Sequence, residues 1–261
     1  VFVALIIGAI FWHPLALLAL FFVFNAIALN EFSRMFASKG YDISPISVIF
    51  NGSVVYLMIG LYANHFVDVK VFLLFIPIIF VQFIASLYKI SEKPFEELGI
   101  KVLAIIYLSV PFGLFNIVEN IGQEILGHRE PLLLMAFFLM VWSSDTFAYL
   151  TGSAFGKHRL FERISPKKSW EGSIGGGVIT LIIAGVFGYY SAIFTPLVWV
   201  MLALITVITA IYGDLIESQL KRSMGVKDSG NIMPGHGGIL DRFDAAIFSI
   251  PFYVFLLYLL A

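Results

Sequence analysis

Residues 196–215 read PLVWVMLALITVITAIYGDL, an apolar run whose single charged residue is Asp214. A helix that crosses a bilayer needs about 20 mostly apolar residues, so this run predicts a transmembrane helix. Val1–Trp12 is a shorter apolar run, which we count as an additional span. Seven more runs of spanning length are Pro14–Ser33, Ile43–Ala63, Val71–Tyr88, Val102–Ile121, Pro131–Gly152, Ser173–Ala192 and Phe243–Ala261. The sequence therefore predicts an all-α, polytopic membrane helix bundle of about nine transmembrane helices.

The composition supports a membrane protein and excludes several other classes. Of 261 residues, 60% are hydrophobic and 13% charged, whereas soluble domains are about half apolar and about a quarter charged. The net charge of −1 argues against a nucleic-acid partner. The absence of Cys excludes disulfides, thiolate metal sites and Cys nucleophiles. We expect one continuous membrane domain, with N-terminal helices in 1–130 and the helices that carry the polar motifs in 131–261.

The placement of basic residues predicts the orientation in the membrane. If nine helices alternate, 14 of the 16 Lys and Arg residues fall on one side, and only Lys70 and Arg129 fall on the other. Basic loops stay in the cytoplasm. We therefore expect a multi-pass protein of the cell (inner) membrane whose polar motifs face the cytoplasm.

The first polar motif lies where the run 196–215 ends. Asp214, Glu217, Ser218 and Lys221 are spaced i, i+3, i+4 and i+7, so they share one face of a helix. A carboxylate inside an apolar run is costly unless it is paired or binds a cation, which favours a cation-binding role for Asp214. For Glu217 and Lys221, solvated charges at an ordinary helix end are an equal alternative.

The second motif follows within twenty residues. It consists of two short stretches, Lys227-Asp228-Ser229-Gly230 and Pro234-Gly-His236-Gly237-Gly. The glycines of the second stretch allow the backbone to approach a phosphate chain closely. Asp241 and Asp244 then begin the last span, and oxygen-only ligands favour Mg²⁺ over Zn²⁺. A simple turn between helices is the alternative, but a turn does not need the charged residues on either side.

Two further motifs lie upstream. Ser165-Pro-Lys167-Lys168-Ser169 precedes a glycine-rich helix start, which suits an anionic phosphate group, although cytoplasmic basic charge alone would also explain the lysines. Asp145 sits well inside the apolar run Pro131–Gly152. A carboxylate in that position is a functional candidate, with a structural hydrogen bond as the alternative.

Together these residues resemble the phosphatidate cytidylyltransferase family, the CDP-diacylglycerol synthases. The family pattern Ser-x2-Lys-Arg-x4-Lys-Asp-x-Gly-x3-Pro-x-His-Gly-Gly-x2-Asp-Arg-x-Asp is matched without a gap over 218–244. Ser144-Asp145, Phe155–His158 and Ser165-Pro166-x-Lys168 also resemble the family. The resemblance covers roughly the C-terminal half of the chain.

The resemblance implies the reaction of CTP with phosphatidate to give CDP-diacylglycerol and pyrophosphate, with Mg²⁺, at the cytoplasmic face of the bilayer. It implies Mg²⁺ on Asp214 and Asp241, with Asp145 and Asp244 completing the site or holding a second cation such as K⁺. The expected catalytic residues are Asp214, Asp241, Asp244 and Lys221. The expected substrate contacts are Ser165, Lys167, Lys168, Ser218, Arg222, Lys227, Asp228, His236 and Gly237. A homodimer is compatible with a bundle that is polar at one end.

Other classes of protein explain less of the sequence. An ion-coupled transporter would also place aspartates in the membrane, but it does not need a long polar loop motif. A CTP-dependent polyprenol kinase would use the same nucleotide in a similar setting. A CDP-alcohol phosphatidyltransferase would carry an Asp-Gly-x2-Ala-Arg motif, which is missing here.

Overall fold

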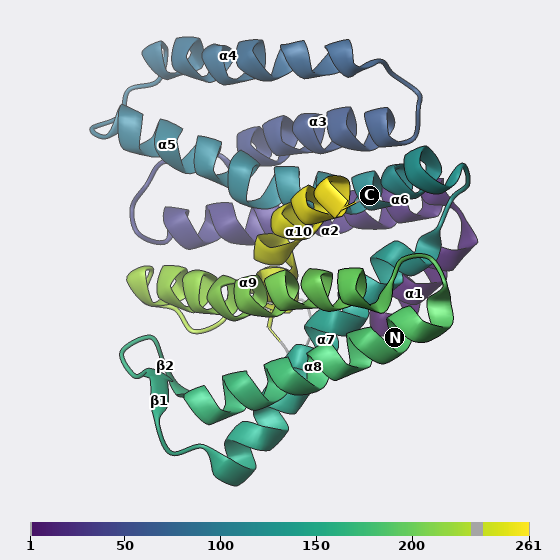
Figure 1. Cartoon of the computed structure of the whole chain (residues 1–261). Coiled ribbons are helices and arrows are strands. Elements are labelled where there is room, and N and C mark those ends of the chain that lie inside the picture. The colour runs from purple at the N-terminus through teal and green to yellow at the C-terminus, as the bar shows by residue number, and fades with distance from the viewer. Residues whose placement is uncertain (1, 231–236, 261) are drawn as a thin grey trace. The chain divides into compact units, whose positions relative to one another are not determined.

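The computed structural model describes residues 2–230 and 237–260 (Figure 1). Within these ranges, proline is the first residue of five of the ten α-helices. Proline suits a first helical turn because its missing N–H would have no partner there and its φ angle already fits a helix. The N-terminal elements are α1 (Phe2–Trp12), α2 (Pro14–Ala37), α3 (Pro45–Ala63), a 3₁₀ helix η1 (Val69–Leu74), α4 (Phe75–Leu87), α5 (Pro94–Ala104), a π turn η2 (Ile105–Ser109) and α6 (Val110–Leu126). The C-terminal elements are α7 (Pro131–Phe155), β1 (Arg159–Phe161), β2 (Ser165–Ser169), α8 (Trp170–Ser191), α9 (Pro196–Ser223) and α10 (Leu240–Leu260).

The predicted membrane spans are confirmed by the helices. Within the described residues, 8 helical segments are long and apolar enough to cross a membrane, and each contains or overlaps one of the eight long runs read from the sequence. The additional short run forms α1, a helix of 11 residues, whereas a span needs about 20. Helix α9 has 28 residues and extends two turns beyond the predicted end at Leu215. The polar residues Glu217, Ser218 and Lys221 are therefore part of a regular helix.

The chain forms two compact units, which divide close to residue 130. Unit 1 comprises Val1–Arg129 and Met224–Arg242, and unit 2 comprises Glu130–Ser223 and Phe243–Ala261. The segment 224–242, which we grouped by sequence with the C-terminal helices, therefore packs with the N-terminal ones. Helix α10 begins in unit 1 and continues in unit 2.

Unit 1 is built around α2, α3 and α6, which pack against one another. Its core holds Phe21, whose ring centroid lies 4.9 Å from that of Phe115. Buried polar groups in this core are partly paired: the Tyr56 hydroxyl donates to the Leu18 carbonyl (2.7 Å) and accepts from the Asn116 amide (3.2 Å). Such pairing is needed because lipid offers no hydrogen bonds.

Unit 2 is built on α8, which packs against both α7 and α9 (Figure 1). Gly176 makes the α7 contact close, because a Cβ at this position would lie 2.6 Å from the backbone nitrogen of Ala148. The Tyr253 hydroxyl of α10 donates to the Leu133 carbonyl of α7 (2.8 Å). Small residues and buried hydrogen bonds are the usual means by which membrane helices associate.

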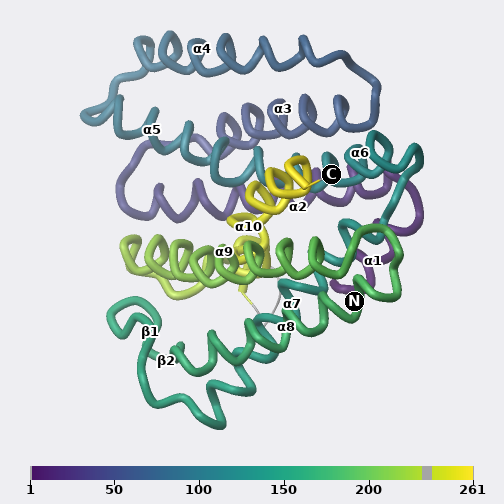
Figure 2. The backbone as a smooth tube through the Cα atoms, in the orientation of Figure 1, coloured from purple at the N-terminus to yellow at the C-terminus, as the bar shows by residue number. Residues whose placement is uncertain are grey.

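A β-hairpin connects α7 to α8, as the backbone trace in Figure 2 shows. Strands β1 and β2 pair antiparallel, with Arg159 opposite Ser169 and Phe161 opposite Ser165. The predicted spans end at Gly152 and resume at Ser173, so no strands were predicted from the sequence for the residues between them. The hairpin matters for the site because β2 carries the two lysines of the third motif.

Candidate functional site

Asp214 is held by groups from its own helix and from the hairpin. Its Oδ2 atom forms an ion pair with the Lys168 ammonium group, and its Oδ1 atom accepts a hydrogen bond from the Ser218 hydroxyl (3.2 Å). Ser218 lies one turn further along α9, as the predicted i, i+4 spacing requires. The Lys168 and Asp214 side chains each keep somewhat more than a quarter of their surface exposed, so a ligand can reach this pair.

Two more aspartates of unit 2 lie close enough to interact with this pair. Asp145 on α7 interacts electrostatically with both Lys168 and Asp214. Asp244 on α10 interacts with Asp214, Glu217 and Asp145. We call Asp145, Asp214, Glu217 and Asp244 the carboxylate cluster. Three separate helices supply it.

Gly213 allows α9 and α10 to approach each other at the carboxylate cluster. A Cβ on this residue would lie 2.7 Å from the backbone carbonyl oxygen of Asp244 and 2.7 Å from the Cβ of Phe248. Any other residue would push the helices apart. The close packing of α9 and α10 therefore explains why the residue before Asp214 is a glycine.

Glu217 and Lys221 form a pair on the same helix. The Lys221 nitrogen lies 2.5 Å from Glu217 Oε2, and the Glu217 side chain is fully buried while 11% of the Lys221 side chain is exposed. A buried carboxylate requires such a partner because an isolated charge is very costly away from water. The alternative considered from the sequence, in which both charges are solvated, is therefore wrong for Glu217.

The hairpin orients the two lysines of the third motif differently. Successive side chains of a strand point to opposite faces, and Lys168 is the one that pairs with Asp214, whereas Lys167 is exposed. Ser165 starts the same strand. The end of the strand is tied to α8, because the Ser169 hydroxyl caps this helix by accepting from the Gly172 amide (3.1 Å). Lys168 therefore reaches the carboxylate cluster from a rigid support.

Asp241 lies in unit 1, in the first turn of α10, and accepts hydrogen bonds from the described residues Ser229 and Gly238. Its Oδ2 atom accepts from the Ser229 amide (2.9 Å), the Ser229 hydroxyl (2.8 Å) and the Gly238 amide (2.8 Å). Gly237 has a φ of +80°, and a Cβ there would lie 2.6 Å from Asp241 Oδ2. A glycine is required at this position both by its conformation and by the close carboxylate.

Glu31 on α2 anchors the same segment and was not among the site residues predicted from the sequence. Its carboxylate accepts from the amides of Ile239 (3.0 Å) and Leu240 (2.9 Å) and from the Ser229 hydroxyl (3.3 Å). The side chain is only 4% exposed. We call these contacts the Glu31 anchor. The signal was available, since a carboxylate inside the apolar run Pro14–Ser33 meets the criterion that selected Asp145.

The Glu31 anchor also explains one glycine of the second motif. A Cβ on Gly230 would lie 2.6 Å from Glu31 Oε1. The carboxylate at the start of α10 further suits the partial positive charge of a helix N-terminus. A single buried side chain thus positions both ends of the motif segment.

The remaining predicted site residues have less defined surroundings. Arg222 is exposed near the end of α9, and Lys227 and Asp228 are exposed in unit 1 ahead of Ser229. His236 lies outside the described residues. Unit 2 thus brings together Asp145, Lys168, Asp214, Ser218, Lys221 and Asp244, and unit 1 brings together Gly237 and Asp241 with the motif segment.

The side chains of the two sets are of the types that bind cations and phosphates. Carboxylate oxygens are the ligands that Mg²⁺ prefers, and lysine ammonium groups neutralise phosphate oxygens. Within residues 2–230 and 237–260, no three acidic or imidazole side chains are arranged to hold a metal ion. The expected ligands are nevertheless of the right type, and the repulsion among the carboxylates of unit 2 would be relieved by a divalent cation.

Comparisons with known proteins place this chain in one family. The family model described as the cytidylyltransferase family matches residues 1–260. Proteins named phosphatidate cytidylyltransferase are similar to this chain: that of Bacillus subtilis is 43% identical over 166 residues (62% of this chain and 59% of the relative), and that of Haemophilus influenzae is 44% identical over 128 residues (46% and 44%). The protein of that name from Staphylococcus haemolyticus is 38% identical over 180 residues (67% and 65%). The matched segments cover between 44% and 65% of these three relatives.

Proposed function

Because the chain belongs to the cytidylyltransferase family, we propose that it transfers the cytidylyl group of CTP to phosphatidate, which yields CDP-diacylglycerol and pyrophosphate. The observation that carries the proposal is the Lys168–Asp214 pair beside Asp145 and Asp244, which combines groups suited to phosphate and to a cation. The names of the relatives support the choice of substrates. The reaction would belong to phospholipid biosynthesis.

The chemistry needs positioning and charge neutralisation more than a covalent nucleophile. An oxygen of the phosphatidate phosphate attacks the α-phosphorus of CTP, a new P–O bond forms, and the bond to the bridging oxygen breaks as pyrophosphate leaves. Two anionic substrates must be held in line for this step. Lys168 and Lys221 in unit 2, with Lys167, Arg222 and Lys227, are proposed to bind the phosphates of both substrates.

The carboxylates are proposed to hold the metal. Asp214 and Asp241 are the expected Mg²⁺ ligands, and Asp145 and Asp244 are expected to complete the site or to hold a second cation such as K⁺. When bound, Mg²⁺ supplies neutralisation of the charge that builds up on the triphosphate. The chain itself orients Asp241 through Ser229 and Gly238, and Asp214 through Ser218. The remaining substrate contacts, Ser165, Asp228, His236 and Gly237, are proposed from their place in the motifs.

One assay tests this function. The purified protein is incubated with [α-³²P]CTP, phosphatidate and Mg²⁺, and both the lipid fraction and released pyrophosphate are measured. We expect equal amounts of labelled lipid and pyrophosphate. Release of CDP with phosphorylation of a polyprenol would instead indicate a kinase, and labelled-ion uptake into vesicles without CTP turnover would indicate a transporter. Either result would overturn the proposal.

We further propose that the site faces the cytoplasm, and this predicts a labelling pattern. The chain has no Cys, so single cysteines report one position each. A Cys at Pro166, which is exposed on β2, is expected to react with a membrane-impermeant maleimide only after the inner face is opened. A Cys at Asp68, in the loop before η1, is expected to react in intact cells. The reverse pattern would contradict the charge-based orientation and the cytoplasmic CTP site.

A further inference from the structure

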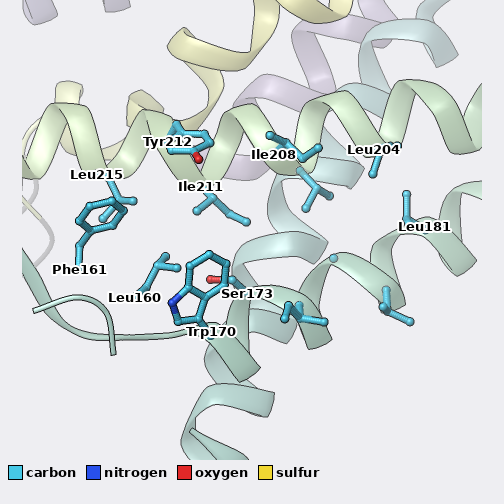
Figure 3. A pocket seen from close by; sticks show the side chains of 14 residues that line it. Leu160, Phe161, Trp170, Ser173, Leu181, Leu204, Ile208, Ile211, Tyr212 and Leu215 are labelled. Carbon is cyan, nitrogen blue, oxygen red and sulfur yellow. The ribbon is translucent and has the colours of Figure 1, made fainter. Parts of the chain in front are cut away.

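An apolar groove of about 340 Å³ runs between α8 and α9 in unit 2 (Figure 3). The lining residues of both helices follow the same spacing, i, i+3, i+4, i+7, i+8 and i+11. The first of them is Trp170 on α8 and Leu204 on α9. This spacing is one continuous stripe along a helix. Leu160 and Phe161 of β1 complete the wall at one end.

Small residues on α8 create the groove. Ser173 and Gly177 lie in the middle of its stripe, where larger side chains would fill the space. A Cβ on Gly177 would lie 3.2 Å from the side chain of Val207, so α9 closes the floor at this point. The bulky side chains around them form walls, and several remain about half exposed, among them Ile208 and Leu204.

The lining selects an uncharged, apolar occupant. None of the described residues that line the groove is charged, and the only polar side-chain groups are those of Trp170, Ser173 and Tyr212. A nucleotide triphosphate would find no partner for its charges there. A hydrocarbon chain makes favourable van der Waals contacts with such a lining. It has no polar groups, so it loses no hydrogen bonds when it enters the groove.

One end of the groove adjoins the carboxylate cluster. Leu215 follows Asp214 on α9, and Trp170 comes two residues after Lys168 at the end of β2. Figure 3 shows Phe161, Leu215 and Trp170 at one end and Leu181 and Leu204 at the other. Trp and Tyr at the charged end match the preference of these side chains for the level of lipid headgroups. The Lys168–Asp214 pair therefore marks a headgroup end, and the rest of the groove is apolar.

The dimensions fit a single chain of methylene groups. Leu204 and Leu215 are eleven residues apart on α9, which is about 16 Å of helix. The volume of about 340 Å³ corresponds to roughly eleven groups of the size of water or methylene.

We propose that this groove binds one acyl chain of the phosphatidate substrate, with the lipid phosphate at the Lys168 end. The inference rests on the proposed function for the identity of the lipid. It assigns to α8 and α9 the task of holding the apolar part of the substrate while the charged residues hold the phosphate.

A pair of matched variants tests the groove. Val178 lines it and is 50% exposed, whereas Val186, two turns further along α8, is 53% exposed and does not line it. We expect Val178→Trp to raise the KM for long-chain phosphatidate about tenfold, the loss expected when about two methylene groups lose their contacts. The KM for CTP and turnover of dihexanoyl phosphatidate should stay near the wild-type values. Val186→Trp should change none of these quantities.

A binding measurement separates this inference from the proposed function. Phosphatidate with a diazirine near the end of one acyl chain is photo-crosslinked to the wild-type protein in detergent, without CTP, and the labelled peptides are identified by mass spectrometry. We expect labelling around Leu181 and Leu204 that unlabelled phosphatidate suppresses and phosphatidylcholine does not. Equal suppression by phosphatidylcholine, crosslinking elsewhere, or equal kinetics of the two Trp variants would overturn the inference. Groove labelling without any CTP turnover would support the groove and refute the cytidylyl transfer.

Discussion

Replacement of Asp214 by Asn is expected to reduce cytidylyl transfer by about 10³-fold or more, because it removes the charge of a proposed Mg²⁺ ligand from the site proposed to neutralise the triphosphate. Asp214 forms an ion pair with Lys168 and lies beside Asp145 and Asp244, so its charge affects every group of the cluster. Asp241→Asn should cause a loss of similar size. The measurement is turnover of labelled CTP at saturating Mg²⁺ and phosphatidate.

The double variant Asp214→Asn/Asp241→Asn should be hardly worse than either single variant, because residues that act as a unit are not additive. Asp68→Asn is the matched control, since Asn can also cap η1, and it should leave turnover unchanged. Unchanged elution from a sizing column in detergent verifies folding. Near-normal turnover of Asp214→Asn would show that the ligand assignment is wrong, and Asp145 with Asp244 would then be the pair to replace.

Glu31→Gln is expected to lower turnover by about 10²-fold although Glu31 is not proposed to touch a substrate. Its carboxylate accepts from the Ile239 and Leu240 amides and the Ser229 hydroxyl, and an amide nitrogen in place of one oxygen would face a donor. An unsatisfied buried donor costs about 1–3 kcal/mol, which is enough to displace the segment. Small displacements of positioned groups cost rates of this order.

The dependence on Mg²⁺ distinguishes this positioning role from a general loss of stability. Ser229 donates both to Glu31 and to Asp241, so loosening the Glu31 anchor should raise the Mg²⁺ concentration needed for half-maximal turnover. Glu92→Gln, at an exposed position of unit 1, is the matched control and should alter neither quantity. A Glu31→Gln protein with a lower melting temperature but unchanged Mg²⁺ dependence would reduce Glu31 to a purely structural role.

Much of the site could be predicted from residue spacing along single helices. The i, i+4 relation of Asp214 to Ser218 and of Glu217 to Lys221 depends only on the local helix, and both pairs are present. The position of Lys168 relative to Asp214 was not predictable in this way, because it depends on a hairpin that brings residues 46 positions apart together. Glu31 itself met the criterion of a carboxylate inside an apolar run, but its partners could not be predicted, because Ile239 and Leu240 lie 208 and 209 positions along the chain.

The sequence by itself determined the membrane class and the eight long spans, because hydropathy and helix periodicity are properties of short stretches. The cation and phosphate chemistry of the site stays a prediction from its residue types. The tertiary structure alone decided which charges meet within each unit, why Gly213 and Gly237 are glycines, and that α8 and α9 enclose a groove. These features depend on the distance between the backbones of helices that pack together. A local pattern of residues carries no information about that distance until the helices are packed.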